Sequence, residues 1–240
     1  MGFLMDPLYI AILAPAIILS LIAQAKVSMA FNKYKKVPAA SGMSGAQAAA
    51  KMLRASGIPD VGIEQIGGVL SDHYDPTKKV LRLSPEVYQG RSLAALGIAC
   101  HEAGHALQHA KGYTPLYLRT ALVPVASFGS QGGMYLLFFG ILLQMMGAFF
   151  GYYVALLGFF AFTVAVLFTL VTLPVEFDAS RRAKLQLFEL GMLSGPNEQK
   201  GVSKVLNAAA LTYVAAAITA LLTLLYYAIR LGLIGGRDER

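Results

Sequence analysis

His101, Glu102 and His105 are the residues whose types and spacing most clearly indicate chemistry. They form the pattern His-Glu-x-x-His in a segment that we expect to be one helix, from about Leu93 to Ala110. At about 3.6 residues per turn the two histidines stand one above the other, so both imidazoles can reach one metal ion. Glu102 is rotated by about 100° from His101, toward the place of a water molecule on the metal. The pattern is typical of sites where two histidines hold Zn²⁺ and the glutamate takes a proton from that water.

The local sequence favours a helix that is buried. Ser92 is a candidate N-cap, no proline interrupts the segment, and Lys111 and Gly112 are typical of a helix C-terminus. The residues before His101 are apolar, and Cys100, the single cysteine, is expected to pack there rather than act as a nucleophile. The same pattern can also occur on an ordinary helix surface. Burial argues against that alternative, because a buried ionised group is costly unless a metal or a partner compensates it.

The elements that position this segment include membrane spans. The chain has 240 residues, of which 56% are hydrophobic and only 14% are charged. Uncharged runs cover residues 7–25, the whole stretch between Arg119 and Glu176, and residues 205–229. The middle run is too long for one span and has a natural break between Gln144 and Gly151. We therefore expect four transmembrane helices.

The expected fold is a membrane α-helical protein with a small α+β, zincin-like catalytic region that carries the HExxH helix. Its predicted parts are an N-terminal transmembrane anchor (1–30), a cytoplasmic metallopeptidase region (31–115), a transmembrane helical hairpin (116–175), a cytoplasmic segment with the third zinc ligand (176–204), and a C-terminal transmembrane helix and tail (205–240). The first run has no basic residues before it and no cleavage site with the expected flanks, so we expect an anchor rather than a removed signal peptide.

The positive charge predicts orientation rather than a nucleic-acid partner. The net charge is +7, but the basic residues cluster after the first span, at Lys26, Lys33, Lys35 and Lys36, and before the last, at Arg181, Arg182, Lys184, Lys200 and Lys204. The positive-inside rule then places both loops, and the HExxH helix, on the cytoplasmic side and the N-terminus outside.

Between the first span and the HExxH helix we expect several short helices, strands and turns. Ser44 and Gln47 fit a capping box that opens a helix. Residues 61–70 are a weak strand candidate, a turn around Asp75-Pro76 follows, and Val80–Leu83 alternates like a strand, so we expect a hairpin. Val80–Leu83 is either the edge to which an extended peptide adds or a strand packed under the helix. Farther on, residues 184–201 are expected to be a polar loop.

A catalytic zinc site keeps three protein ligands, so a third donor is needed. Glu176 is favoured, because it is the first ionisable residue after the long uncharged run. At this residue the chain is expected to leave the membrane on the same side as the HExxH helix. Asp178 competes for this role. Alternatively, Glu176 is an interfacial carboxylate paired with Arg181 or Arg182.

Two further histidines lie outside the pattern. His109 is eight residues after His101, about 12 Å along the helix axis, which is too far to share the ion. We expect it to support the site or lie at the surface. His73 could donate to a tetrahedral intermediate, although a turn histidine is more often bonded locally, here to Asp72 or Asp75.

Three segments resemble the YugP family of bacterial membrane zinc metallopeptidases: Asp72 to Tyr88, Ala99 to Pro115 with its His-Glu-Ala-Gly-His core, and Leu173 to Arg182. A glutamate followed by Phe-x-Ala after HExxH is also distantly similar to gluzincins of the HtpX and CAAX-protease type. The resemblance implies a bacterial inner-membrane enzyme with Zn²⁺ held by His101, His105 and Glu176. Those relatives have an orienting aspartate where this chain has Ser180, and Asp178 is the residue that could replace it.

The leading functional hypothesis is an integral membrane endopeptidase with Glu102 as general base. One alternative is an intramembrane metalloprotease of the site-2 type, although no Asp-Gly pair occurs in any expected span. The other is a non-catalytic zinc-binding scaffold or regulator, in which Glu102 would have no role. The expected partners are a peptide or membrane-protein substrate, the lipid bilayer, and a second copy or another membrane protein.

Overall fold

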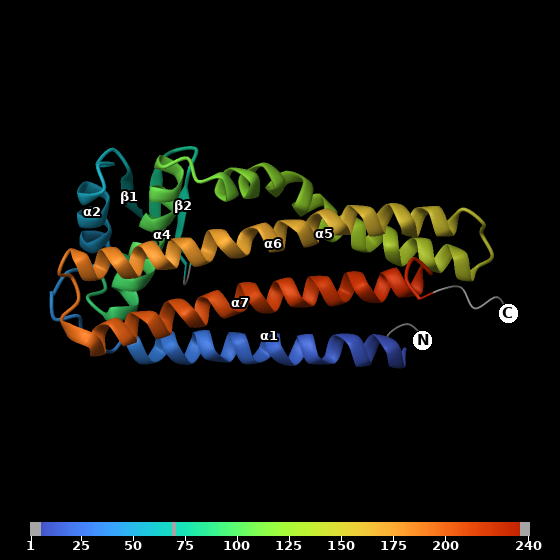
Figure 1. The fold of residues 1–240 in the computed structure, drawn as a ribbon, viewed down its shortest axis with the longest axis horizontal. Helices are drawn as coiled ribbons and strands as arrows, with labels where there is room; N and C mark the ends of the chain where they lie inside the picture. The colour runs from blue at the N-terminus through green and yellow to red at the C-terminus, as the bar shows by residue number, and fades with distance from the viewer. Residues whose placement is uncertain (1–5, 69–70, 236–240) are drawn as a thin grey trace. The chain divides into compact units, whose positions relative to one another are not determined.

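The computed structural model describes residues 6–68 and 71–235, and most of them are helical (Figure 1). In chain order the elements are α1 (Pro7–Tyr34), α2 (Gly45–Ala55), β1 (Gly62–Gln65), β2 (His73–Asp75), β3 (Val80–Leu83), α3 (Pro85–Tyr88), α4 (Leu93–Ala110), α5 (Thr114–Met145), α6 (Gly151–Glu189) and α7 (Gly195–Arg230). The chain divides into two compact units. The bundle unit comprises Met1–Ile22, Leu118–Thr172 and Tyr213–Arg240, and the site unit comprises Ala23–Tyr117 and Leu173–Thr212.

Four helices of the described chain, α1, α5, α6 and α7, are long and apolar enough to cross a membrane. This confirms the four expected spans. The long uncharged run also breaks in the predicted place, because α5 ends at Met145 and α6 begins at Gly151. Gly147 lies in that turn with a φ of 83°, a conformation that glycine adopts without steric cost.

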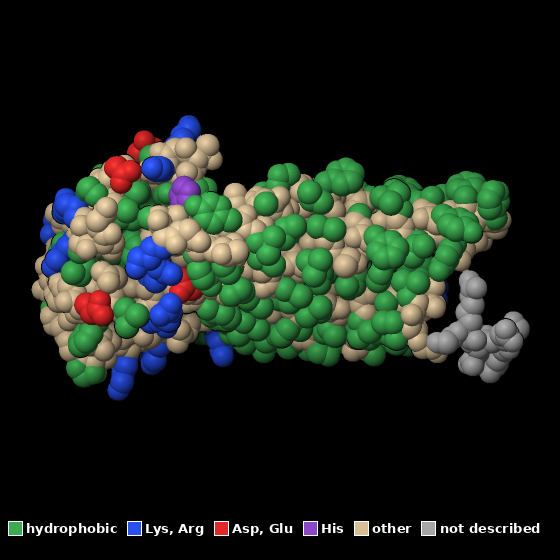
Figure 2. Space-filling model, turned by 45° about the horizontal axis from the view of Figure 1, so that its top comes forward, with side chains coloured by type: hydrophobic (Ala, Val, Ile, Leu, Met, Phe, Trp, Pro, Cys, Tyr) green, Lys and Arg blue, Asp and Glu red, His purple; other side chains and the backbone are tan. Residues whose placement is uncertain are grey.

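Apolar side chains fill the interior of the bundle unit and also cover its surface. Leu137 of α5, Phe162 of α6 and Tyr226 of α7 belong to one buried cluster. A Cβ atom at Gly140 would lie only 2.2 Å from the backbone nitrogen of Ala155, so the small residue lets α5 and α6 approach closely. On the face seen in Figure 2, hydrophobic side chains cover this unit, as a surface in contact with lipid requires.

The site unit has its own core between α2 and α4. Ser44 caps α2 with the predicted capping box, since its side chain accepts a bond from the Gln47 backbone and the Gln47 side chain accepts one in return. Met52 of α2 packs in the same buried cluster as Leu96 and Ala103 of α4. The helix that carries the HExxH pattern therefore lies in a hydrophobic core, as its apolar sequence predicted.

The small sheet differs from its prediction. Its strand order is β1-β3-β2, with β1 parallel and β2 antiparallel to β3. The hairpin therefore joins β2 to β3, and the residues expected to be only a turn form strand β2. Val80–Leu83 is the central strand, so the first of the two alternatives considered for it, a free edge, is wrong. Both of its sides are already hydrogen-bonded, which leaves no row of free amides for a peptide.

The predicted polar loop at residues 184–201 is mostly helical. Helix α6 continues to Glu189 and α7 begins at Gly195, so only residues 190–194 connect them. The connection is stabilised by Glu198, whose carboxylate accepts bonds from the backbone amides of Ala40 and Ser194. The polar composition of this stretch reflects helix surface rather than irregular chain, and charged side chains are conspicuous on the site unit in Figure 2.

Candidate metal centre

Helix α4 has the predicted limits and N-cap. It spans Leu93–Ala110, and the Ser92 side chain accepts a bond of 3.2 Å from the Ala95 amide. His101 and His105 lie one turn apart on it, with their ring centroids 4.8 Å apart. The regular helix therefore brings the two imidazoles together without any special backbone conformation.

Helix α6 brings the third donor, and a glycine allows it to come close. A Cβ atom at Gly104 would lie 2.7 Å from the carbonyl oxygen of Ala179 and 3.1 Å from its Cα atom. The first distance is shorter than real Cβ atoms show, and the obstacle is backbone, so the second x of the HExxH pattern must be very small here. This close approach places Glu176, three residues before Ala179, beside the two histidines.

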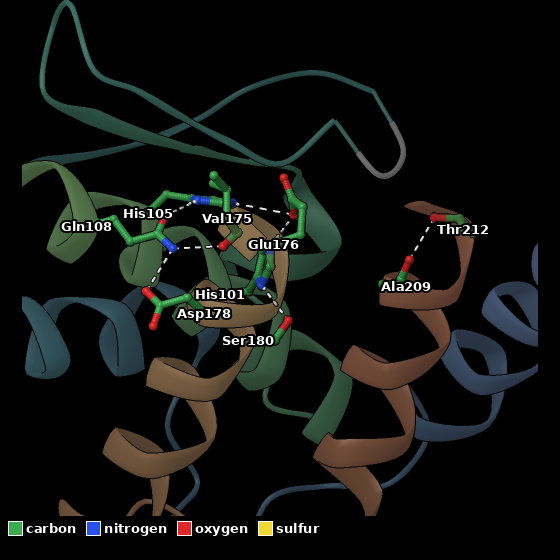
Figure 3. Close-up of polar contacts among 9 residues, drawn as sticks. All are labelled: His101, His105, Gln108, Val175, Glu176, Asp178, Ser180, Ala209 and Thr212. Carbon is green, nitrogen blue, oxygen red and sulfur yellow. Dashed lines mark hydrogen bonds and ion pairs between the residues drawn. The ribbon is translucent and has the colours of Figure 1, made fainter. Parts of the chain in front are cut away.

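The three donors converge on one point, as Figure 3 shows. One carboxylate oxygen of Glu176, Oε2, lies 3.2 Å from His101 Nε2 and 3.6 Å from His105 Nε2. Zinc bonds of about 2.1 Å in a tetrahedral arrangement separate two donor atoms by about 3.4 Å. The observed spacing and the nitrogen and oxygen donor types therefore fit a zinc ion with little adjustment.

Burial makes this arrangement informative. The Glu176 residue is only 2% exposed, and His105 is 7% exposed. Burial opposes a charge on His105, but the hydrogen bond and the negative charge of Glu176 outweigh that effect and raise the pKa of the imidazole. The surroundings of the cluster therefore favour positive charge at this place, which a bound cation would supply.

The outer nitrogen of each imidazole also has a partner. His101 Nδ1 lies 3.1 Å from the hydroxyl oxygen of Ser180, and His105 Nδ1 lies 2.9 Å from Gln108 Oε1. Such outer bonds orient a ring so that its other nitrogen faces the metal. Ser180, which stands where those relatives have an aspartate, thus bonds His101 itself, whereas Asp178, the expected substitute, bonds Gln108.

Asp178 does not touch either histidine. Its carboxylate accepts a 3.0 Å bond from Gln108 Nε2 and is also bonded by the guanidinium groups of Arg181 and Arg182. These two arginines bond Asp178, whereas the carboxylate of Glu176 bonds the two histidines. Asp178 is connected by hydrogen bonds to His105 through Gln108. Sequence reasoning missed Gln108, although its position three residues after His105 on one helix face was a usable signal.

Glu102 lies beside the donors without being one of them. It is 9% exposed, and its carboxylate has no hydrogen-bond partner among the described residues. A carboxylate that is held in a core but not engaged by the protein is available to a water molecule or a substrate. Cys100 is fully buried, and burial raises the pKa of its thiol, which agrees with a packing role.

The remaining predicted residues lie outside the donor cluster. The Nδ1 atom of His109 is hydrogen-bonded to the hydroxyl group of Tyr74 at 2.9 Å, and the hydroxyl group of Tyr117 donates to the backbone oxygen of His109. His73 is exposed on β2, and its Nδ1 lies 2.8 Å from the carbonyl oxygen of Ser71. His73 is therefore bonded locally, as expected, but its partner is a backbone carbonyl rather than the predicted aspartate.

The spans and the donor cluster together define a membrane protein with a two-histidine, one-carboxylate cluster that could hold a metal ion. The chain belongs to the family described as "Putative neutral zinc metallopeptidase", which matches residues 9–232. Membership makes Zn²⁺ the cofactor, and the cluster of His101, His105 and Glu176 is suited to hold it.

A curated relative supports the same family. The chain is 47% identical over 232 residues to a protein of Bacillus subtilis (strain 168) named "Putative membrane protease YugP". The similarity covers 97% of this chain and 99% of that protein. It confirms the family that the sequence motifs resembled. No solved structure matches the chain.

Proposed function

We propose that the chain is an integral membrane endopeptidase that hydrolyses peptide bonds, with His101, His105 and Glu176 as zinc ligands and Glu102 as general base. The observation that carries the proposal is the convergence of the three donors around one buried carboxylate oxygen, beside an unengaged glutamate. Bound zinc would polarise the scissile carbonyl and make water a stronger nucleophile at neutral pH.

The protein's own residues account for the proton transfers. Glu102 accepts a proton from water, and the resulting hydroxyl oxygen forms a bond to the carbonyl carbon of the peptide. The carbon–nitrogen bond then breaks, and Glu102 delivers the proton to the leaving amine. One acid–base residue is sufficient because the proton taken from water is the proton given to the amine.

The position of α4 favours this type over an intramembrane protease. An intramembrane metalloprotease carries its HExxH pattern on a spanning helix, whereas α4 is not among the candidate spans of the described chain. A non-catalytic zinc scaffold would give Glu102 no role. Peptides or membrane proteins with an accessible segment are therefore the proposed substrates.

The orientation in the membrane is also part of the proposal. Lysines lie at the end of α1 and directly after it, at Lys33, Lys35 and Lys36, and further basic residues lie on α6 and α7 beyond the uncharged stretches. Positive residues are retained on the cytoplasmic side. We therefore place the site in the cytoplasm and the N-terminus outside, in the inner membrane of a bacterial cell.

The replacement Glu102→Gln tests the catalytic assignment. We expect bound zinc to persist, because the proposed ligands are unchanged, while casein hydrolysis by the purified protein falls by at least about 100-fold, since proton transfer by one group contributes about that much or more. The matched control is Glu86→Gln, an exposed glutamate paired with Lys35, which should leave hydrolysis unchanged. A zinc-loaded, folded Glu102→Gln protein with full activity would remove Glu102 as the base.

A further inference from the structure

Gln108 is a polar side chain at the centre of the site unit that the proposed reaction does not use. It is 0% exposed, on α4, less than one turn after His105. Its amide makes three bonds, to His105 Nδ1 at 2.9 Å, to the Val175 carbonyl oxygen at 2.7 Å and to Asp178 Oδ2 at 3.0 Å (Figure 3). Both hydrogens of the amide and one lone pair of its oxygen are thus directed at specific neighbours.

These partners determine which way the amide faces. The Val175 carbonyl and the Asp178 carboxylate can only accept hydrogen bonds, so the NH₂ group of Gln108 must face them. Its Oε1 atom must then face His105. A flipped amide would place its oxygen against two acceptors, which is strongly unfavourable in a buried site.

The direction of the amide in turn fixes the tautomer of His105. Because Oε1 can only accept, His105 Nδ1 must carry the hydrogen, and the lone pair of the neutral ring lies on Nε2. Nε2 is the atom that faces Glu176 at 3.6 Å. The bonding pattern of Gln108 thus leaves Nε2 as the metal-binding atom of this ring.

We propose that Gln108 is the positioning residue of His105 and that it relays the orientation and charge of Asp178 to that ring. The proposal rests on the proposed metal centre. Ser180 cannot do the same for His101, because a hydroxyl group can rotate and either donate or accept. Gln108 also joins α4 to α6 through the Val175 carbonyl, so it holds His105 and the helix of Glu176 in one hydrogen-bonded unit.

The test compares zinc affinity in full-length purified variants. Gln108→Met keeps the length of the side chain but removes its bonds, and we expect zinc affinity to fall about 10- to 100-fold, the usual loss when an outer partner of a ligand is removed. The visible spectrum of the Co²⁺-loaded protein should also change, because the His105 ring is no longer held. The control Gln89→Met replaces an exposed glutamine and should alter neither result.

A charge exchange separates positioning from packing. Gln108→Glu alone sets a new carboxylate against the Asp178 carboxylate and the Val175 carbonyl, so zinc affinity should fall. Adding Asp178→Asn supplies an amide that donates to the new carboxylate, which still accepts from His105 Nδ1. We expect the double variant to bind zinc more tightly than Gln108→Glu alone, because the bonds to His105 and to the side chain at position 178 are restored, while the Val175 carbonyl still faces a carboxylate.

The outcomes distinguish this proposal from the metal centre itself. If His105→Ala retains full zinc affinity, the proposed ligand set is wrong and the role of Gln108 is overturned with it. If His105→Ala loses zinc but Gln108→Met keeps the original affinity and Co²⁺ spectrum, only the positioning role is overturned. Should Gln108→Met fail to fold, the charge exchange decides, and a double variant no better than Gln108→Glu alone overturns the proposal.

Discussion

Replacing Gly104 by alanine should damage the metal centre through helix spacing alone. The added methyl carbon would lie 2.7 Å from the Ala179 carbonyl oxygen, whereas ordinary contacts begin at 3.4 Å. The difference, 3.4 − 2.7, requires α6 to move away from α4 by about 0.7 Å. The obstacle is backbone, which cannot rotate aside as a side chain can.

The displacement exceeds what the donor cluster tolerates. Glu176 lies on α6 three residues before Ala179, so its carboxylate moves with the displaced helix, while His101 and His105 stay with α4. Metal–ligand distances are held to within about 0.2 Å. We therefore expect zinc affinity to fall about 10- to 100-fold, comparable to the loss of an orienting bond. The free energy of unfolding should fall by about 1–3 kcal/mol, partly offset by the better helix propensity of alanine.

The assay is competition for zinc between the purified protein and a coloured chelator. Gly97→Ala is the matched control on the same helix, because its methyl carbon would meet the Cγ1 atom of Val202 at 3.2 Å, and that side chain can shift. The control should bind zinc as the original protein does. Equal zinc affinities for Gly104→Ala and Gly97→Ala would refute the argument that spacing of α4 and α6 sets the donor geometry.

The other predictions concern the ligands, proton binding and topology. Glu176→Ala should lose zinc on dialysis against a mild chelator, whereas Asp178→Ala should weaken binding only about 10- to 100-fold; full zinc in the first and none in the second would make Asp178 the ligand. In the metal-free protein the raised pKa of His105 contributes stability that is fully present below the unfolded pKa of 6.5 and is lost as pH rises through the folded pKa. Its thermal midpoint in chelator should therefore rise on acidification from pH 8 to pH 6, while zinc affinity falls because protons compete; a midpoint independent of pH would contradict this sign. A cysteine introduced at 33–36 should resist a membrane-impermeant thiol reagent in intact cells and react after lysis, while buried Cys100 stays unlabelled; labelling in intact cells would invert the topology.

Local signals in the sequence predicted the elements that local chemistry determines. Ser92, the uninterrupted apolar run and Gly112 defined α4 correctly, because caps and periodicity act over a few residues. The long uncharged runs predicted the spans for the same reason, since the hydrocarbon core excludes charge along the whole segment. Glu176 was placed near the histidines from its position after such a run, and the structure brings them together.

Partners distant in the chain were not predictable in the same way. Strand β1 pairs with β3, although β2 lies between them in the sequence. Such short strands carry little information about their register, so the sequence did not predict this pairing. Gln108 has partners 67 and 70 residues away, at Val175 and Asp178, so its role appears only once α4 and α6 are packed. The residues 184–201 were mistaken for a loop because polar helix surface and polar loop have similar composition.

Helix α6 links a membrane span to the candidate metal centre. It is continuous over Gly151–Glu189, but its residues up to Thr172 belong to the bundle unit, whereas Glu176 belongs to the site unit together with His101 and His105. Pro174, the only proline inside α6, lies next to that boundary, and a proline leaves one helical hydrogen bond unmade. A bilayer that is too thin or too thick makes a span tilt or shift along its axis. Because the three donors share one compact unit, we expect zinc occupancy to be independent of acyl-chain length even though α6 includes a span.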